Sequence, residues 1–375
     1  MTGFSSNVMS EIPSLKPIDP KTIGLQRNGG KYFIGYRSSE GGMLPAFSPA
    51  VEVGQFSVTA RGDVVCDSSA ARAVRGSLIG RKVPLIDLTV GFSEALDVID
   101  KDDSGWFATD MNHFFKWCML SGTSEVLTDV HVVVARRTIA HIVRTLTQTS
   151  DALRLVARLE GGIVYIQELD NEQEKILSAK QLKSVYSNVM FKQFATSQDP
   201  ENQVIFTKPN SRHYVVTKTK LPTPCGGPLL NVLCLAEVNA LDVDGRPIDL
   251  ALHNEDRVFG GTKLLEARVQ SMLIDQDKAV VGYHLYRKLT KIDYKHFDCA
   301  KEQNRRDDEY GRARFRIALV LYEIKKFLWM LHDRGYKSSL IMEHVNEDNT
   351  FTFRKPTNEE RKFIPQEFLD FVAKK

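Results

Sequence analysis

The segment that decides the fold runs from residue 229 to residue 284, and it opens with the apolar sequence LLNVLCLAEVNALD at residues 229–242. Aliphatic and β-branched residues dominate this sequence, which is typical of a buried strand. Side chains alternate along a strand, so Glu237 and Asn239 are expected on the same face. Burying a polar side chain without a partner costs roughly 1–3 kcal/mol. We therefore expect a functional site where these two side chains lie.

The sequence after this strand predicts a turn and two more strands. VDGRP at residues 243–247 has turn composition, and IDLAL at residues 248–252 predicts a short strand that leads to His253. KAVVGYH at residues 278–284 predicts a further strand. The strand at residues 278–284 closes this unit of the chain.

A helix is predicted between these strands, over KLLEARVQSML at residues 263–273. Leu265, Val269 and Met272 fall on one stripe of that helix, and Gln270 lies beside the stripe. If the stripe faces the core, Gln270 is placed next to the strand that carries Glu237.

Composition limits the possible functions of the chain. A length of 375 residues corresponds to one or two domains, and a hydrophobic fraction of 42% is ordinary for a globular protein. The 50 basic and 47 acidic residues leave a net charge of only +3. The molecule as a whole is therefore no polycation, and any surface that binds nucleic acid must be a local groove.

The cysteines and the apolar segments indicate an intracellular protein. The cysteines are five in number, widely spaced and mostly within apolar sequence, which favours buried free thiols over disulfides or a zinc site. No apolar segment approaches the roughly 18 residues of a membrane span, and the N-terminal sequence is polar. We expect a location in the nucleus, the cytoplasm or both. The cysteines are Cys66, Cys118, Cys225, Cys234 and Cys299.

The remaining pattern predicts an α+β fold, with central mixed β-sheets flanked by helices. Residues 1–50 are rich in Gly, Pro and Ser and are expected to be a tail that packs over the core, while residues 51–375 form one domain. Arg61-Gly62-Asp63 supplies turn chemistry for a hairpin. The predicted helices are 104–120, 132–147, 175–194 and 311–333, with Gly335 as the cap of the last one. The predicted strands are the hairpin 53–67, the strand 161–170 and a second hairpin of 203–207 with 213–217.

Two sets of side chains on these helices need interpretation. The aromatic residues of the 104–120 helix recur at helical spacing, which favours core packing over stacking on bases. Lys192 lies on the same stripe as Leu182, Val185 and Val189, three apolar residues of the 175–194 helix. A lysine there either extends to solvent at the helix end or points into something polar, and both alternatives stay open. The aromatic residues are Trp106, Phe107, Phe114, Phe115 and Trp117.

Several segments, in the order in which they occur, resemble the DXO family of decapping exoribonucleases, which remove aberrant 5′ caps or other 5′ groups from RNA. The segment at residues 53–74 resembles the family's GxFS hairpin, and VARRTIAHIVRTL at residues 134–146 resembles the segment with its first-motif arginine, here Arg136. KLLEARVQSML with KAVVGYH, and FIPQEFLDFV at residues 363–372, resemble later family segments. The resemblance implies a fold related to PD-(D/E)XK nucleases, and a fungal branch of the family binds the nuclear 5′–3′ exoribonuclease.

The chain departs from the family at the residues that carry the chemistry. The resemblance places the glutamate of the second motif on a lysine and retains only the first acid of the third motif. Both functional residues of the fourth motif are lost, and the glutamine of the last motif is kept. In chain order the corresponding residues are Lys192, Glu237, Asn239, Ala251, His253 and Gln270.

These departures predict the loss of the metal site. Mg²⁺ and Mn²⁺ require clustered oxygen ligands, and Glu237 is the only retained carboxylate. Asp242, Glu255 and Asp256 are near in sequence, but they lie past the strand or in the following loop. A lone histidine such as His253 is more often structural than catalytic. We therefore expect no cofactor, and Mg²⁺ or Mn²⁺ only if the chain is an active nuclease.

The sequence thus favours a pseudo-enzyme that binds RNA 5′ ends in RNA quality control or regulation, with Arg136, Lys192, His253 and Gln270 as the RNA-binding residues. A working, divergent decapping nuclease is one alternative, and a scaffold that binds only protein is the other. The expected partners are an RNA 5′ end and, by the resemblance, a 5′–3′ exoribonuclease or another RNA-processing protein. Neither a membrane nor DNA is expected as a partner.

Overall fold

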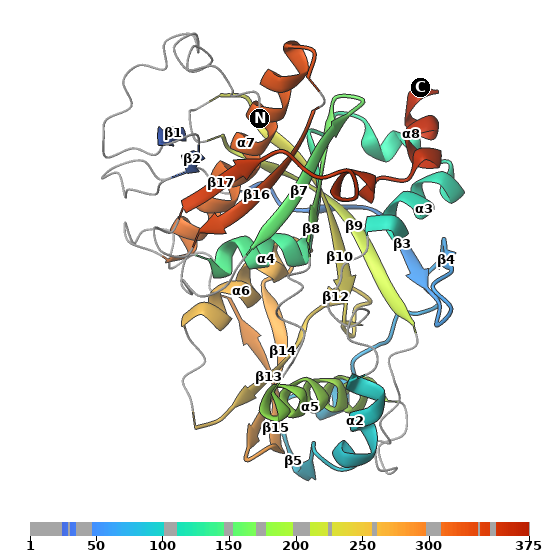
Figure 1. The fold of residues 1–375 in the computed structure, drawn as a ribbon. Helices are drawn as coiled ribbons and strands as arrows, with labels where there is room; N and C mark the ends of the chain where they lie inside the picture. The colour runs from blue at the N-terminus through green and yellow to red at the C-terminus, as the bar shows by residue number, and fades with distance from the viewer. Residues whose placement is uncertain are drawn as a thin grey trace.

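The computed structural model places the 229–284 segment at the junction of two β-sheets (Figure 1). Its first strand, β10 (Leu230–Val238), belongs to the larger sheet, and β13 (Leu250–Asn254) and β14 (Lys278–Leu285) belong to the smaller one. The structure describes residues 25–28, 31–34, 47–100, 111–145, 153–169, 178–197, 211–223, 227–256, 261–297, 309–336, 338–345 and 350–374.

The larger sheet contains nine strands within the described ranges, and β10 is one of its interior strands. β10 runs parallel to β6 on one side and antiparallel to β9 on the other. Its side chains from Val232 to Ala236 are buried on both faces, which explains why this segment is almost continuously apolar. In sheet order the strands are β17 (Thr350–Arg354), β16 (Ser339–Val345), β7 (Arg154–Glu160), β8 (Ile163–Glu168), β6 (Val132–Ala135), β10, β9 (Arg212–Leu221), β3 (Val51–Val58) and β4 (Val64–Val65).

Helices cover both faces of this sheet (Figure 1). α4 (Arg136–Arg144), α6 (Gly261–Met272) and α7 (Glu309–Asp333) pack on one face and contribute Ile139, Val269 and Ile324 to its core. α3 (Met111–Ser121) and α8 (Gln366–Ala373) cover the opposite face. The predicted stripe of α6 is confirmed, since Leu265 and Val269 are buried and Met272 packs against the same core.

The helix that contains Lys192 packs on the smaller sheet. The strand order of this sheet is β13–β14–β15–β5, with β15 (Lys288–His296) and β5 (Arg81–Asp87) as its antiparallel members. α5 (Ala179–Thr196) and α2 (Phe92–Asp100) pack on it, at the bottom of Figure 1. Short elements complete the described fold: β1 (Leu25–Asn28), β2 (Lys31–Ile34), β11 (Ala240–Leu241), β12 (Pro247–Ile248), η1 (Gly76–Leu78), η2 (Ser124–Leu127) and η3 (Glu360–Phe363).

Most of the elements predicted from sequence are confirmed, and the fold is of the predicted α+β class. The hairpin at residues 53–67 is β3 and β4, and Gly62 adopts a φ of 82° in its turn. α7 ends as expected, with Gly335 at a φ of 72° and its backbone N–H donating to the carbonyl of His332. No described helix is long and apolar enough to cross a membrane.

One helix prediction is wrong at its start. Residues 132–135, VVVA, form the parallel strand β6, and α4 begins only at Arg136. Three consecutive valines favour a strand, and β6 pairs with β8 and β10 while all four of its residues are buried. β7 and α2 were not predicted.

Some predictions fall partly or wholly outside the described residues. These include the strand at 203–207, Trp106, Phe107, Cys225, Cys299 and most of the proposed tail. Of the described cysteines, Cys118 and Cys234 are buried free thiols as expected, whereas Cys66 is exposed. The division into residues 1–50 and 51–375 stays a prediction.

The packing of α5 on the smaller sheet depends on one glycine. A Cβ added at Gly282 of β14 would lie within 2.8 Å of three ring carbons of Phe191, the residue before Lys192. α5 therefore lies as close to the sheet as the absence of a side chain at Gly282 permits.

We expect Gly282→Ala to lower the free energy of unfolding by about 1–3 kcal/mol, because the methyl group overpacks the contact with Phe191. Urea denaturation of the full chain measures the change. Gly311→Ala is the matched control: nothing lies within 4 Å of a Cβ at that helical position, so the same substitution should be neutral or stabilising. Equal effects of the two substitutions would contradict the packing argument.

Candidate functional site

Arg136 is at the centre of the candidate site. It is buried, at 5% exposure, and its guanidinium donates two hydrogen bonds to the carboxylate of Asp249, at 3.0 and 2.9 Å. The same guanidinium donates to the backbone carbonyl of Glu237 at 2.6 Å and to that of Gln270 at 3.4 Å. One side chain thus ties together the end of β10, the helix α6 and the residue that precedes β13.

The topology explains why Arg136 lies there. β6 and β10 are parallel neighbours, and Ala135 is opposite Leu235. The carboxyl ends of both strands therefore meet, and the first residue after β6 is beside the last residues of β10. In sheets with parallel strands, ligands commonly bind outside these carboxyl ends.

Lys192 lies within electrostatic range of the same residues. The side chain of Lys192 is half-buried, and burial is the largest cause of the lowering of its pKa from 10.5. The carboxylates of Glu237 and Asp249 oppose that lowering, while Arg136 adds to it. Of the two alternatives for this lysine, the structure therefore favours the polar environment. We call Arg136, Lys192, Glu237 and Asp249 the Lys192 cluster.

Glu237 is the most accessible member of the Lys192 cluster. Its carboxylate is 4.0 Å from Nη1 of Arg212, and 45% of its side chain is exposed. Among the described residues, no ion pair within 4.0 Å joins Glu237 to Lys192. Lys192 and Glu237 therefore attract each other without forming a contact pair.

The other predicted site residues are placed as follows. Asn239 is half-buried in the bend between β10 and β11, and Ala251 is half-buried on β13. His253, also on β13, is buried, and its ring meets that of Tyr283 edge-on with the centroids 6.0 Å apart. Gln270 is brought to Arg136 through its backbone carbonyl. The catalytic, metal and RNA-binding roles of these residues stay predictions.

Asp249 is a residue of the site that was not predicted from sequence. It follows β12 in the apolar sequence PIDLAL, where it is 8% exposed. A charged residue inside an apolar strand sequence was the available signal, and the same signal had identified Glu237. The site therefore contains two carboxylates, although both oxygens of Asp249 already accept hydrogen bonds from Arg136.

Two of the three acids considered as substitutes, Asp242 and Glu255, are engaged elsewhere. Asp242 is buried and accepts hydrogen bonds from the backbone N–H groups of Asp244 and Arg246, and Lys278 lies 3.5 Å away. Glu255 accepts a hydrogen bond from the hydroxyl of Thr290 at 2.9 Å. The carboxylate of Asp242 therefore stabilises the turn at residues 242–246, and the carboxylate of Glu255 is bound by Thr290 of β15.

These residues do not fit a pair of divalent metal ions. Within the described ranges, no group of three or more His, Cys, Asp or Glu side chains could hold a metal. Glu237 is the one carboxylate of the Lys192 cluster that is not bound by Arg136, and an ammonium group lies in range of it. Hard cations need several oxygen ligands, and the positive charge of Lys192 repels them.

The family of the chain is shown by comparison with known proteins. Residues 48–293 match the family described as RAI1 like PD-(D/E)XK nuclease, and the chain belongs to that family. The resemblance to the DXO family is thereby confirmed. No curated protein sequence matches the chain.

Solved structures share this fold at low sequence identity. A mutant of S. pombe Rai1 in complex with 3′-FADP superposes with a TM-score of 0.65 at 13% identity, covering 84% of this chain and 96% of its own. C. albicans Rai1 in complex with pU5-Mn²⁺ gives 0.64 at 14%, covering 88% and 96%. K. lactis Dxo1 in complex with manganese gives 0.57 at 13%, covering 84% and 92%. At identities this low, the superpositions show that the fold is shared.

We expect Arg136→Ala to destabilise the protein by about 3–5 kcal/mol, because it leaves the buried carboxylate of Asp249 without its partner. The double variant Arg136→Met with Asp249→Leu removes both charges and should recover much of that loss. Denaturation of Arg136→Met, of Asp249→Leu and of the double variant measures the coupling between the two side chains. Additive effects would show that the two side chains do not depend on each other.

Proposed function

We propose that the chain is an RNA 5′-end-binding member of its family that lacks metal-dependent nuclease activity. The observation that carries the proposal is the position of Lys192, whose ammonium group lies within electrostatic range of Glu237 and Asp249. By the family resemblance, Lys192 takes the place of a metal-binding glutamate. The cluster thus has the ammonium group of a lysine side chain where the family's nuclease chemistry requires two bound metal ions.

A lysine in this position can contact a terminal phosphate directly. Ammonium and guanidinium groups donate charge-assisted hydrogen bonds to phosphate oxygens without an intervening metal. Desolvation in the free protein lowers the pKa of Lys192, and a bound phosphate dianion would stabilise its protonated form. The pU5 complex of C. albicans Rai1 is consistent with an RNA ligand for this fold.

An intracellular location and a role in RNA decay or quality control belong to the same proposal.

Binding to 5′-phosphorylated RNA should persist in EDTA and weaken as salt concentration rises, because phosphate contacts release counterions. Lys192→Glu should weaken this binding, most strongly for RNA with a 5′ phosphate. Fluorescence anisotropy at two salt concentrations measures the affinities, and a melting curve of each variant establishes that it is folded.

Lys355→Ala, which removes an exposed positive charge outside the Lys192 cluster, is the control for a general effect of charge. Wild-type protein that fails to bind RNA at low salt would support the scaffold alternative instead. A Lys192→Glu variant that only loses stability would give this lysine a structural role.

The affinity for 5′-phosphorylated RNA should also depend on pH above neutrality. In the folded protein the pKa of Lys192 is lowered, so its ammonium group loses its proton at a pH below the ordinary lysine pKa of 10.5. The affinity for RNA should therefore fall as the pH rises through that lowered pKa. The phosphate is already a dianion there, since its second pKa is about 6. Lys192→Arg stays protonated because the pKa of arginine exceeds about 12, so its binding should be constant over the same range. Identical pH profiles of wild type and Lys192→Arg would rule out this lysine as the phosphate ligand.

Capped RNA and 5′-monophosphate RNA should stay intact when incubated with the purified protein in Mg²⁺ or Mn²⁺, because too few oxygen ligands converge on the site. Gel analysis of end-labelled RNA reports cleavage. Glu237→Ala distinguishes intrinsic activity from a contaminating nuclease. Turnover that disappears in this variant would establish the active-nuclease alternative.

A further inference from the structure

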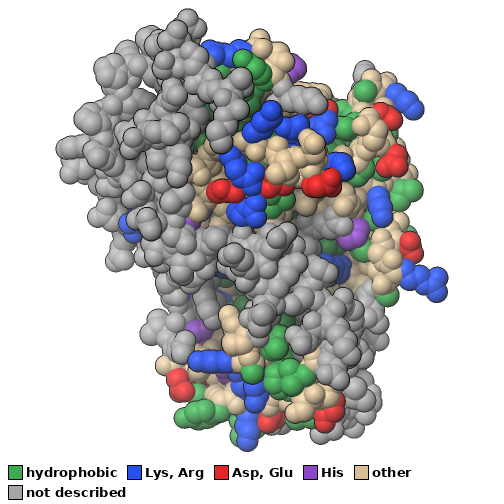
Figure 2. All heavy atoms as spheres, viewed as in Figure 1, with side chains coloured by type: hydrophobic (Ala, Val, Ile, Leu, Met, Phe, Trp, Pro, Cys, Tyr) green, Lys and Arg blue, Asp and Glu red, His purple; other side chains and the backbone are tan. Residues whose placement is uncertain are grey.

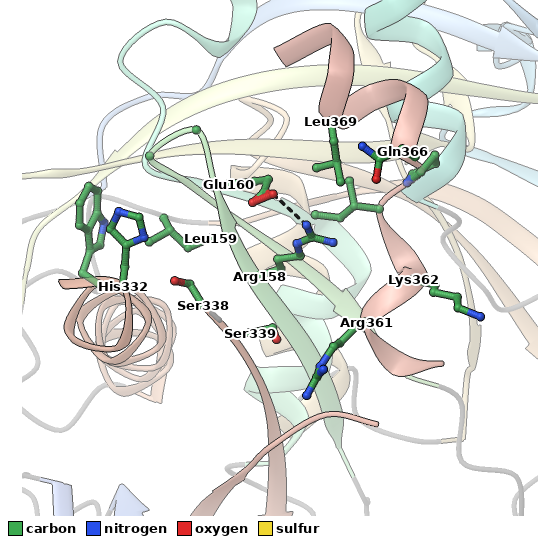
Figure 3. Close-up of a pocket in the computed structure, with 15 residues that line it drawn as sticks. Arg158, Leu159, Glu160, His332, Ser338, Ser339, Arg361, Lys362, Gln366 and Leu369 are labelled. Carbon is green, nitrogen blue, oxygen red and sulfur yellow. Dashed lines mark hydrogen bonds and ion pairs between the residues drawn. The ribbon is translucent and has the colours of Figure 1, made fainter. Parts of the chain in front are cut away.

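A cavity is formed by residues outside the Lys192 cluster, and Figure 3 shows the side chains that line it. Its volume is about 680 Å³, within the range of small-molecule sites. Its walls come from the turn between β7 and β8, the last turns of α7, the start of β16, and the segment from η3 to α8. We call it the Arg361 pocket, after a basic residue in its wall.

The strand directions separate this pocket from the Lys192 cluster. Gly161 and Gly162, which line the pocket, precede β8, and β8 runs parallel to β6. Arg136 follows the opposite end of β6. The full length of β6, about 13 Å at 3.3 Å per residue, therefore lies between the two sites.

The cation that names the pocket has no acidic partner among the described residues. Nε of Arg361 is buried without a hydrogen-bond partner there. The other basic side chains of the wall are paired: Arg158 with Glu160 at 2.8 Å, and Lys362 with Glu359 at 3.0 Å. A buried guanidinium N–H without an acceptor is a place where an anion would be stabilised.

Aromatic and apolar side chains line the same pocket. Trp329 is 36% exposed, and its ring meets that of His332 edge-on at a centroid distance of 5.8 Å. Ile364 is buried in the wall, and Leu369 lies beside it. Figure 3 shows His332 and Arg361 well separated within the pocket. An exposed indole offers a stacking surface for a flat ring, at a distance from the guanidinium.

We propose that the Arg361 pocket binds an aromatic phosphate monoester of the nucleoside monophosphate class. The phosphate accepts hydrogen bonds from the guanidinium of Arg361, and the base packs against Trp329. The hydroxyl of Ser339, on the β16 residue opposite Arg158, is a further donor in the same wall.

The fluorescence of Trp329 provides a local readout in the full-length chain, which contains three tryptophans. AMP is titrated with excitation at the red edge of tryptophan absorption, and the response of Trp329→Phe is subtracted. We expect saturable quenching by AMP, and weaker binding of ribose 5-phosphate and of adenosine, because each lacks one of the two interactions.

Arg361→Ala should weaken AMP binding about tenfold or more, the effect expected for loss of a charged hydrogen bond. Arg361→Lys keeps the positive charge and should bind AMP with intermediate affinity. If the alanine variant does not fold, Arg361→Lys tests the same contact in its place. Lys355→Ala, which removes an exposed positive charge that does not line the pocket, should bind AMP as the wild type does. The proposal is overturned if AMP does not quench Trp329, if Arg361→Ala leaves the affinity unchanged, or if Lys355→Ala weakens binding as much as Arg361→Ala does.

Discussion

The buried ion pair of Arg136 and Asp249 is the interaction on which the arrangement of the site depends. Removing two charges from water is costly, and the mutual attraction of the charges offsets that cost only when the geometry is good and the remaining donors are satisfied. Here the pairing is bidentate, and two backbone carbonyls accept further hydrogen bonds from the same guanidinium. Because Arg136 follows a strand of the larger sheet and Asp249 precedes one of the smaller sheet, the pair couples the two sheets at the site.

This ion pair also sets the charge available to a ligand. Asp249 is neutralised by Arg136, so the remaining charges of the cluster are one carboxylate, on Glu237, and one ammonium group, on Lys192. Side chains on the visible face of the molecule also mix both signs (Figure 2), in keeping with a net charge of +3. Discrimination between RNA ends therefore depends on a few positioned groups rather than on a broad basic surface.

Local sequence pattern predicted elements well where one periodicity dominated, as in β10 and the stripe of α6. It failed at β6, where four residues of strand pass directly into a helix and the apolar pattern suits both. Local sequence pattern could not predict which strands pair, because β6 and β10 lie about 100 residues apart in the chain and meet only in the fold. The importance of Asp249 has the same origin: its partner Arg136 is 113 residues away. Sequence could place Lys192 on a stripe, but only the fold gives it neighbours.

The smaller sheet has a consequence for the synthesis of the protein. β5 pairs with β15, which is made about 200 residues later, through partners such as Asp87 and Lys288. A growing chain thus presents the edge of β5 to its surroundings long before its partner exists, and unpaired strand edges are templates for aggregation. Contacts between segments this distant also slow folding, because a long loop must close before they form. Newly made copies of this protein should therefore depend on chaperones more than copies of a helical protein of equal length.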